Sequence, residues 1–204
     1  MRHIGMHRVG IPRSMRLVSR MLACFALIAM LSGCAGAFVG AGATVGVAAY
    51  QERGIEGVAR DTKLATQIRA AYLEADATLA TNIGIEVYER RALLTGLIET
   101  EDLRANAVRL AWSIDGVKDV LNEIQIKDEE GIVEFAYDSW ITAQLQTKMT
   151  FDENIMAINY SLETVNSVIY LIGIAQDQAE LDRVIAHAKG IDRVRRVISH
   201  VRVK

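Results

Sequence analysis

The residue best suited to covalent chemistry is Cys34, which closes the tetrapeptide Leu31-Ser32-Gly33-Cys34. An uncharged apolar run, Met21 to Leu31, leads into it, and the segment before that run carries five arginines and no acidic residue. A basic segment, a short apolar run and small residues in this order are typical of a secretory signal peptide. The run is too short to span a bilayer of about 30 Å at about 1.5 Å per residue.

A cysteine directly after such a signal indicates a lipobox, the motif at which the thiol is attached to lipid through a thioether. Cys24 lies inside the apolar run, so the mature chain keeps only Cys34 and has no internal disulfide and no cysteine metal site. We predict a signal peptide over residues 1–33, which is removed, and lipidation of Cys34. Several acyl chains, palmitate among them, would give a stable anchor, because one chain binds only marginally. The alternative to lipidation is a plain signal peptide in which Cys34 has no special role. Separately, the start codon could be that of Met6 or Met15 in place of Met1.

Removal of the presequence makes the chain acidic. The whole chain has 23 basic and 25 acidic residues, and the loss of five arginines leaves 18 basic residues and a formal net charge of −7. An exported acidic protein is poorly suited to bind nucleic acid. We therefore expect no nucleic-acid partner.

Residues 33–57 contain seven of the fifteen glycines and predict a pliable apolar tether over residues 34–59. Gly40, Gly42 and Gly46 resemble a phosphate-binding glycine loop superficially, but no strand precedes them and no crossover unit surrounds them. The spacings of Gly36 and Gly40 and of Gly42 and Gly46 also fit a contact between small residues on two helices, although the uncharged stretch is too short for a membrane span.

The rest of the chain consists of two copies of one internal repeat. At a shift of 77 residues and without a gap, Asp61 to Ile126 overlays Asp138 to Val203. Identical pairs include Gln67 and Gln144, Ala80 and Ala157, Asn82 and Asn159, Glu86 and Glu163, Leu94 and Leu171, and Gly96 and Gly173. The repeat predicts a first domain at 60–127, a linker at 128–137 and a second domain at 138–204.

Both copies show the same succession of patterns. Apolar side chains recur at i, i+4 and i+8 and mark a first helix, in Leu64, Ile68 and Tyr72 and in Ile141, Leu145 and Met149. Two short strands meet at polar turns, Glu89-Arg90-Arg91 and Asn166-Ser167, and a second helix follows at about 101–114 and 177–189. A closing strand alternates with period two, with Val120, Ile124 and Ile126, or Val197, Val201 and Val203, expected to face inward. We predict an α+β protein of two tandem αββαβ domains, each with helices on one face of a three-stranded sheet.

The sequence offers little for catalysis. His187 and His200 remain after export, and no paired histidine spacing, Gly-x-Ser-x-Gly or nucleophile with a nearby base accompanies them. We expect both histidines to be surface residues, and Trp112 to fill the core or a domain interface. We predict no catalytic residues, no metal, no cofactor and no enzymatic activity.

The domain pattern resembles the BON family of bacterial envelope domains. The residues that carry the resemblance are the strand glycine with its apolar neighbours (Leu94-Thr95-Gly96-Leu97-Ile98 and Leu171-Ile172-Gly173-Ile174), the alanine-bearing second helix, and the ending Ile114-Asp115-Gly116-Val117. Arg193 stands where the first copy has Gly116. We therefore expect the helix-to-strand turn of the second copy to be made differently, with Gly190 as the residue that allows it.

The plan of lipobox, tether and two such domains is similar to that of dual-BON outer-membrane lipoproteins. That resemblance implies a lipid-anchored protein on the periplasmic side of the outer membrane, which binds anionic phospholipid through its second domain and supports outer-membrane integrity without catalysis. Ala35 is not the aspartate of an inner-membrane retention signal, which favours the outer membrane. The alternative is a scaffold for protein partners in the envelope, with the anchor for location only.

The candidate phospholipid-binding residues are one flank of the second domain's first helix, Trp140, Gln144 and Lys148, and four arginines, Arg193, Arg195, Arg196 and Arg202. An aromatic ring and a lysine on one ridge suit a membrane interface. The first copy has Lys63 in place of Trp140, so the fold does not require an apolar residue there. Two alternatives stand beside this hypothesis: Trp140 packs against the first domain, or the arginines form a solvated edge that discourages strand pairing.

Overall fold

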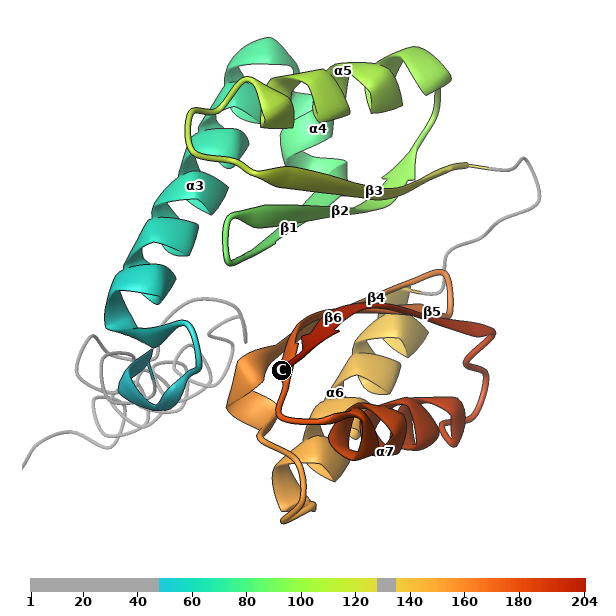
Figure 1. Ribbon diagram of the computed structural model, residues 1–204. Coiled ribbons are helices and arrows are strands. Elements are labelled where there is room, and N and C mark those ends of the chain that lie inside the picture. Colours follow the sequence, from blue (N-terminus) through green and yellow to red (C-terminus); the bar gives the residue numbers. More distant parts are fainter. Residues whose placement is uncertain (1–47, 128–134) are drawn as a thin grey trace, which may run out of the picture. The chain divides into compact units, whose positions relative to one another are not determined.

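The computed structural model describes residues 48–127 and 135–204, and each range contains one α+β domain (Figure 1). The first domain consists of α3 (Gly54–Ala75), α4 (Ala77–Asn82), β1 (Ile83–Tyr88), β2 (Arg91–Ile98), α5 (Glu101–Trp112) and β3 (Asp119–Ile126). The second consists of α6 (Phe135–Phe151), the short 3-10 helix η1 (Ala157–Asn159), β4 (Tyr160–Val165), β5 (Val168–Ala175), α7 (Gln178–Lys189) and β6 (Arg196–Val203). The predicted signal peptide, Cys34 and most of the predicted tether and linker lie outside the described residues.

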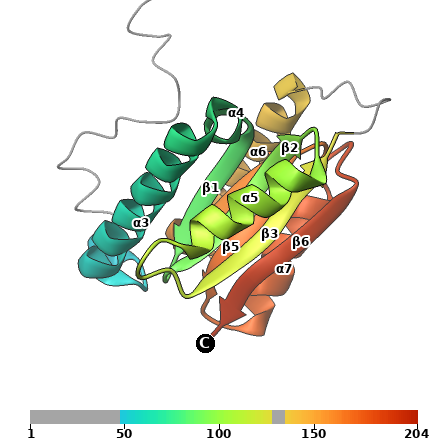
Figure 2. The same ribbon diagram turned by 90° about the horizontal axis from the view of Figure 1, so that it is seen from above.

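Each domain has a mixed three-stranded sheet, in the orders β1-β2-β3 and β4-β5-β6. The first two strands of each sheet form an antiparallel hairpin, and the third strand runs parallel to the middle one. The helices of each domain lie on one face of its own sheet (Figures 1 and 2). The predicted fold class, two tandem αββαβ domains, is confirmed.

The first helix of each domain buries the stripe that its spacing predicted. Leu64, Ile68 and Tyr72 of α3 join the first apolar core, and the corresponding side chains of α6 join the second. Helix α3 begins at Gly54, six residues before the predicted domain boundary, so the end of the predicted tether is helical. The short helix α4 was not predicted, and the side chain of Asp76 caps it by accepting a hydrogen bond from the Thr78 amide at 2.7 Å.

One buried aspartate of each first helix holds the hairpin turn of its sheet. Asp61 accepts hydrogen bonds from the amides of Glu89 (2.8 Å) and Arg90 (2.9 Å), which lead the chain through the β1–β2 turn with positive φ. Asp138 accepts two bonds of the same kind, 2.7 and 2.8 Å long, from the β4–β5 turn. Positive φ at both turn residues is the geometry that suits a two-residue hairpin.

Gly96 and Gly173 occupy strand positions that exclude a side chain. Their φ angles are +127° and +153°, in a region that other residues rarely adopt. A Cβ on either glycine would lie 2.1 Å from a backbone carbonyl oxygen, that of Asn82 or Asn159. The glycines therefore let the middle strand approach the start of the first strand.

The helix-to-strand turn of the second domain corrects one expectation. Gly190 has an ordinary φ of −83°, whereas Arg193 itself adopts a φ of +66° where Gly116 of the first domain has +102°. Both domains therefore place a left-handed residue at the same point, and the second domain does so with an arginine, at a local cost in backbone energy.

The described residues of both domains belong to one compact unit, and a third apolar cluster joins their sheets. It contains Tyr88, Leu93, Val165, Val168, Tyr170, Ile172 and Ile174, with Leu97, Leu121 and Ile198 packed against it. Leu121 and Ile198 alternate with the residues expected to face inward, so the opposite faces of the closing strands are partly covered by the partner domain. Val203, which was expected to face inward, is 39% exposed.

Candidate functional site

The strongest candidate surface is one flank of α6, next to its buried stripe. Trp140 is 43% exposed, Gln144 is half-buried and Lys148 is exposed, as expected of a ridge at i, i+4 and i+8. The same flank also presents Tyr137, which is 36% exposed, and Phe151, which is 82% exposed. We call these five residues the α6 ridge.

Sequence reasoning missed Tyr137 and Phe151, although their spacing carried the signal. They lie three residues before Trp140 and three residues after Lys148, which keeps all five side chains on one side of a helix with 3.6 residues per turn.

The first domain supplies a comparison for this ridge on the same fold. At a shift of 77 residues, the five positions correspond to Arg60, Lys63, Gln67, Ala71 and Glu74 of α3. None of these is aromatic, and four of the five are exposed while Ala71 is half-buried, on a helix that packs its own core in the same way. The three aromatic side chains of the α6 ridge are therefore not needed to fold the domain.

Of the four candidate arginines, Arg193 contacts the ridge. Its guanidinium carbon lies 3.8 Å from the centre of the Tyr137 ring, a cation–π contact. Arg195 and Arg196 are exposed at the start of β6. The α6 ridge and the turn before β6 thus place aromatic and cationic side chains next to each other on the second domain.

Arg202, by contrast, is engaged with the first domain. It forms an ion pair with Glu89 in the β1–β2 turn. Two neighbours also contact the first domain: the His200 ring forms a hydrogen bond with Glu123 at 2.8 Å, and Lys204 forms an ion pair with Glu52 at 2.7 Å. The structure does not bring Arg202 to the α6 ridge.

A sequence profile of the BON domain matches residues 60–128 and 137–204, which is most of the described chain. The chain belongs to the BON-domain family. It is 28% identical to the outer membrane lipoprotein DolP of Haemophilus influenzae over 84% of this chain and 90% of that protein. It is 27% identical to the osmotically-inducible protein Y of Escherichia coli over 71% and 73%, and 46% identical to an uncharacterized protein of Anaplasma centrale over 61% and 83%.

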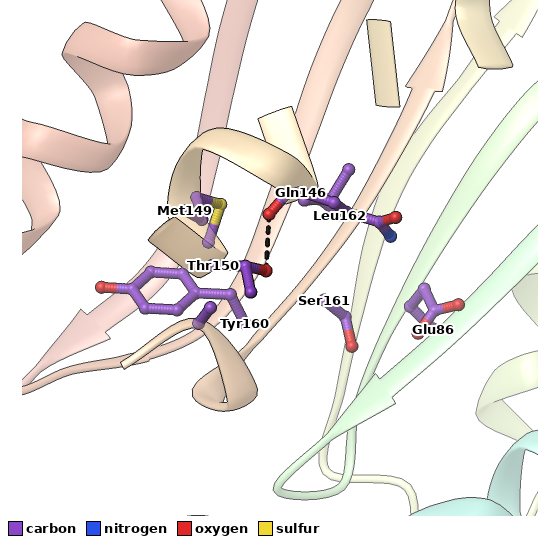
Figure 3. A pocket seen from close by; sticks show the side chains of 8 residues that line it. Glu86, Gln146, Met149, Thr150, Tyr160, Ser161 and Leu162 are labelled. Atoms are coloured by element: carbon purple, nitrogen blue, oxygen red, sulfur yellow. Dashed lines mark hydrogen bonds between the residues drawn. The ribbon is translucent and has the colours of Figure 1, made fainter. Parts of the chain in front are cut away.

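A cavity of about 360 Å³ opens on the other flank of α6 (Figure 3). Gln146 and Thr150 of α6 line it together with Ser161 and Leu162 of β4, and Glu86 of the first BON domain faces it. Burial raises the pKa of the Glu86 carboxyl, and the Ser161 hydroxyl partly offsets that rise.

Three further residues singled out in the sequence are Trp112, His187 and His200. Trp112 is 50% exposed at the end of α5, so the expectation that it fills the core or an interface was wrong. His187 is partly exposed and lies 2.8 Å from Asp152, while His200 lies between the BON domains. Among residues 48–127 and 135–204, no group of three or more His, Cys, Asp or Glu side chains could hold a metal ion. None of the helices in these ranges is long and apolar enough to cross a membrane.

Proposed function

We propose that this protein is a lipid-anchored envelope protein whose second BON domain binds anionic phospholipid through the α6 ridge. The single observation that carries the proposal is the row of exposed aromatic side chains, Tyr137, Trp140 and Phe151, beside Lys148. Amphipathic rings settle at the level of lipid headgroups, and each basic residue near an anionic surface contributes about 1 kcal/mol. Arg193, Arg195 and Arg196 extend the cationic side of this contact.

The location we propose is the periplasmic side of the outer membrane, with the anchor at Cys34 after removal of residues 1–33. The basis is the lipobox, the residue Ala35 that follows it, and the similarity to a relative named as an outer membrane lipoprotein. The protein would hold its second BON domain against the membrane surface and support outer-membrane integrity without catalysing a reaction.

Vesicle flotation tests the contact without the anchor. The complete chain carrying Cys34→Ala is mixed with vesicles of phosphatidylglycerol or of phosphatidylcholine. We expect recovery with the anionic vesicles only. Trp140→Glu should lower the partition constant about tenfold or more, because it removes an aromatic side chain and adds a negative charge.

The matched control is Trp112→Glu, which changes an exposed tryptophan of the first BON domain in the same way. It should leave vesicle recovery unchanged. Equal recovery with both kinds of vesicle, or equal loss from both tryptophan variants, would contradict the proposed contact. Crosslinking to one stoichiometric protein partner, with no vesicle binding, would favour a scaffold instead.

A further inference from the structure

A second cavity of the described chain is strongly basic. It has a volume of about 380 Å³ and lies where the start of α3, the β1–β2 turn and the turn before β3 meet. Six cationic side chains line it, namely Arg53, Arg60, Arg90, Arg91, Lys118 and Arg202, together with two glutamates. We call it the basic cavity, and its lining carries a formal charge of +4, from six cations and two carboxylates.

The positive charge of the cavity is opposite in sign to the net charge of the domain around it. Residues 48–127 contain ten basic and thirteen acidic residues, so the domain is acidic overall. Half of those ten basic residues nevertheless line the basic cavity. Charges of one sign gathered in a concave site focus the local potential and attract an ion of the opposite sign.

Three of the arginines are held in place by the fold. Arg53 donates from Nη1 to Asp61 (2.9 Å) and to the Val87 carbonyl (2.8 Å), and its guanidinium stacks 4.3 Å from the centre of the Tyr88 ring. Arg90 donates from Nε to the Gly116 carbonyl at 2.6 Å, and Arg91 donates from Nη1 to the His200 carbonyl at 2.9 Å. A guanidinium has five N–H donors, so each of these groups is fixed and keeps donors for a ligand.

Arg60 and Lys118 differ from these three. Both are exposed, and within the described part of the chain neither side chain has a hydrogen bond or an ion pair. Neither therefore stabilises the fold through a direct polar contact of its side chain. Together with the fixed arginines they form a site with a rigid base and two free cations.

The second BON domain shows that the fold does not require three of these arginines, whereas the counterpart of Lys118 is Arg195, which is also a cation. The counterparts of Arg60, Arg90 and Arg91 at a shift of 77 residues are Tyr137, Ser167 and Val168. Ser167 makes the same backbone hydrogen bond to its buried aspartate as Arg90 does. The arginines of the first domain are thus additions to a fold that closes its hairpin without them.

We propose that the basic cavity binds a phosphate group, carried by a phosphate monoester or diester. Several guanidinium groups converging on one site match the tetrahedral oxygens of phosphate, which accept paired hydrogen bonds, better than they match a single carboxylate. The site is separate from the α6 ridge and does not depend on the function proposed above. The phosphate could belong to a lipid headgroup or to a free anion, which the test separates.

The test is a titration of the complete chain, purified in nonionic detergent, with inorganic phosphate at constant ionic strength, followed by amide signals in NMR spectra. We expect saturable shifts at the amides of Arg90 and Lys118. The double variant Arg60→Gln/Lys118→Gln should weaken the apparent affinity at least about fivefold, because it removes two charge-assisted contacts. The control double variant, Lys63→Gln/Arg109→Gln, makes the same change in net charge with exposed residues outside the cavity and should alter the affinity less than about twofold.

Shifts that do not saturate, or an equal weakening by both double variants, would overturn the proposal. The source of the phosphate is decided by flotation on phosphatidylglycerol vesicles in a chain carrying Cys34→Ala. Loss of recovery in Arg60→Gln/Lys118→Gln would assign the site to a lipid headgroup. If the variant floats as well as the parent while it binds inorganic phosphate more weakly, the site is assigned to a free anion. Trp140→Glu should leave the phosphate titration unchanged, so failure of the α6 ridge contact and failure of the basic cavity can be told apart.

Discussion

At the scale of single residues, the strand glycine of each BON domain is the position least able to change. A methyl group on Gly173 would lie 2.1 Å from the Asn159 carbonyl oxygen and would also need a φ of +153°. We predict that Gly173→Ala lowers the free energy of unfolding by about 3 kcal/mol or more, because backbone strain and a backbone clash combine. Urea denaturation followed by circular dichroism measures the change.

Gly190→Ala is the control for this prediction. Gly190 has an ordinary φ, and the nearest atom to an added Cβ is a carbonyl oxygen at 3.3 Å. That variant should stay within about 1 kcal/mol of the parent protein. If both variants unfold at the same urea concentration, the close approach at Gly173 does not limit the fold.

The turn before β6 shows what residue types alone do not reveal. Arginine at position 193 suggested a different turn from the one that Gly116 makes, yet Arg193 adopts the left-handed conformation itself. The stacking of its guanidinium on Tyr137 is a tertiary contact across 56 residues of sequence. Propensity gives the local preference of a residue, and contacts of this kind can override it.

At the scale of elements, each domain ties its first helix to its hairpin through one carboxylate. We predict that Asp138→Asn lowers the free energy of unfolding by about 2 kcal/mol, because an amide offers one acceptor oxygen to the two turn amides and sets its NH₂ against the other. Denaturation in urea measures it, and Asp192→Asn, an exposed aspartate of the same domain, is the control. Equal stability of the two variants would mean that the turn closes without the carboxylate.

The repeat predicted the elements well and their surroundings less well. Overlaying the copies placed Asp61 on Asp138, but the role of the pair depends on turn amides 28 and 29 residues away, which no local pattern marks. Period-two alternation correctly placed Ile124 in the core. The same alternation assigned the opposite face of β6 to solvent, because it does not show that a second sheet packs on that face.

At the scale of the whole described unit, duplication places corresponding residues in reciprocal contacts between β1 and β4. The carboxyl carbon of Glu163 lies 3.9 Å from the position of a Cβ on Gly84, and Glu86 faces Ser161, the counterpart of Gly84, in one cavity (Figure 3). Glu86 and Glu163, two copies of one glutamate, also line one cavity between the domains. Burial raises the pKa of Glu163, and the nearby charge of Glu86 raises it further.

This pair makes the stability of the unit depend on pH in a defined direction. A carboxyl whose pKa is raised by folding binds its proton more tightly in the folded protein than in the unfolded chain. Its contribution to stability is fully present below the unfolded pKa of about 4.3 and is lost as the pH rises through the folded value. We predict that Glu163→Gln, which removes the charge and keeps the shape, makes the protein more stable than the parent at pH 7.5 and equally stable near pH 4.

Urea midpoints measured between pH 4 and pH 8 check this dependence. Glu153→Gln is the control, because it makes the same substitution at an exposed glutamate of the same domain. A Glu163→Gln variant that is less stable than the parent at pH 7.5 would mean that the ionised carboxylate has a stabilising partner. The predicted sign follows from burial of the Glu163 carboxyl and from the nearby charge of Glu86, because both disfavour its ionised form.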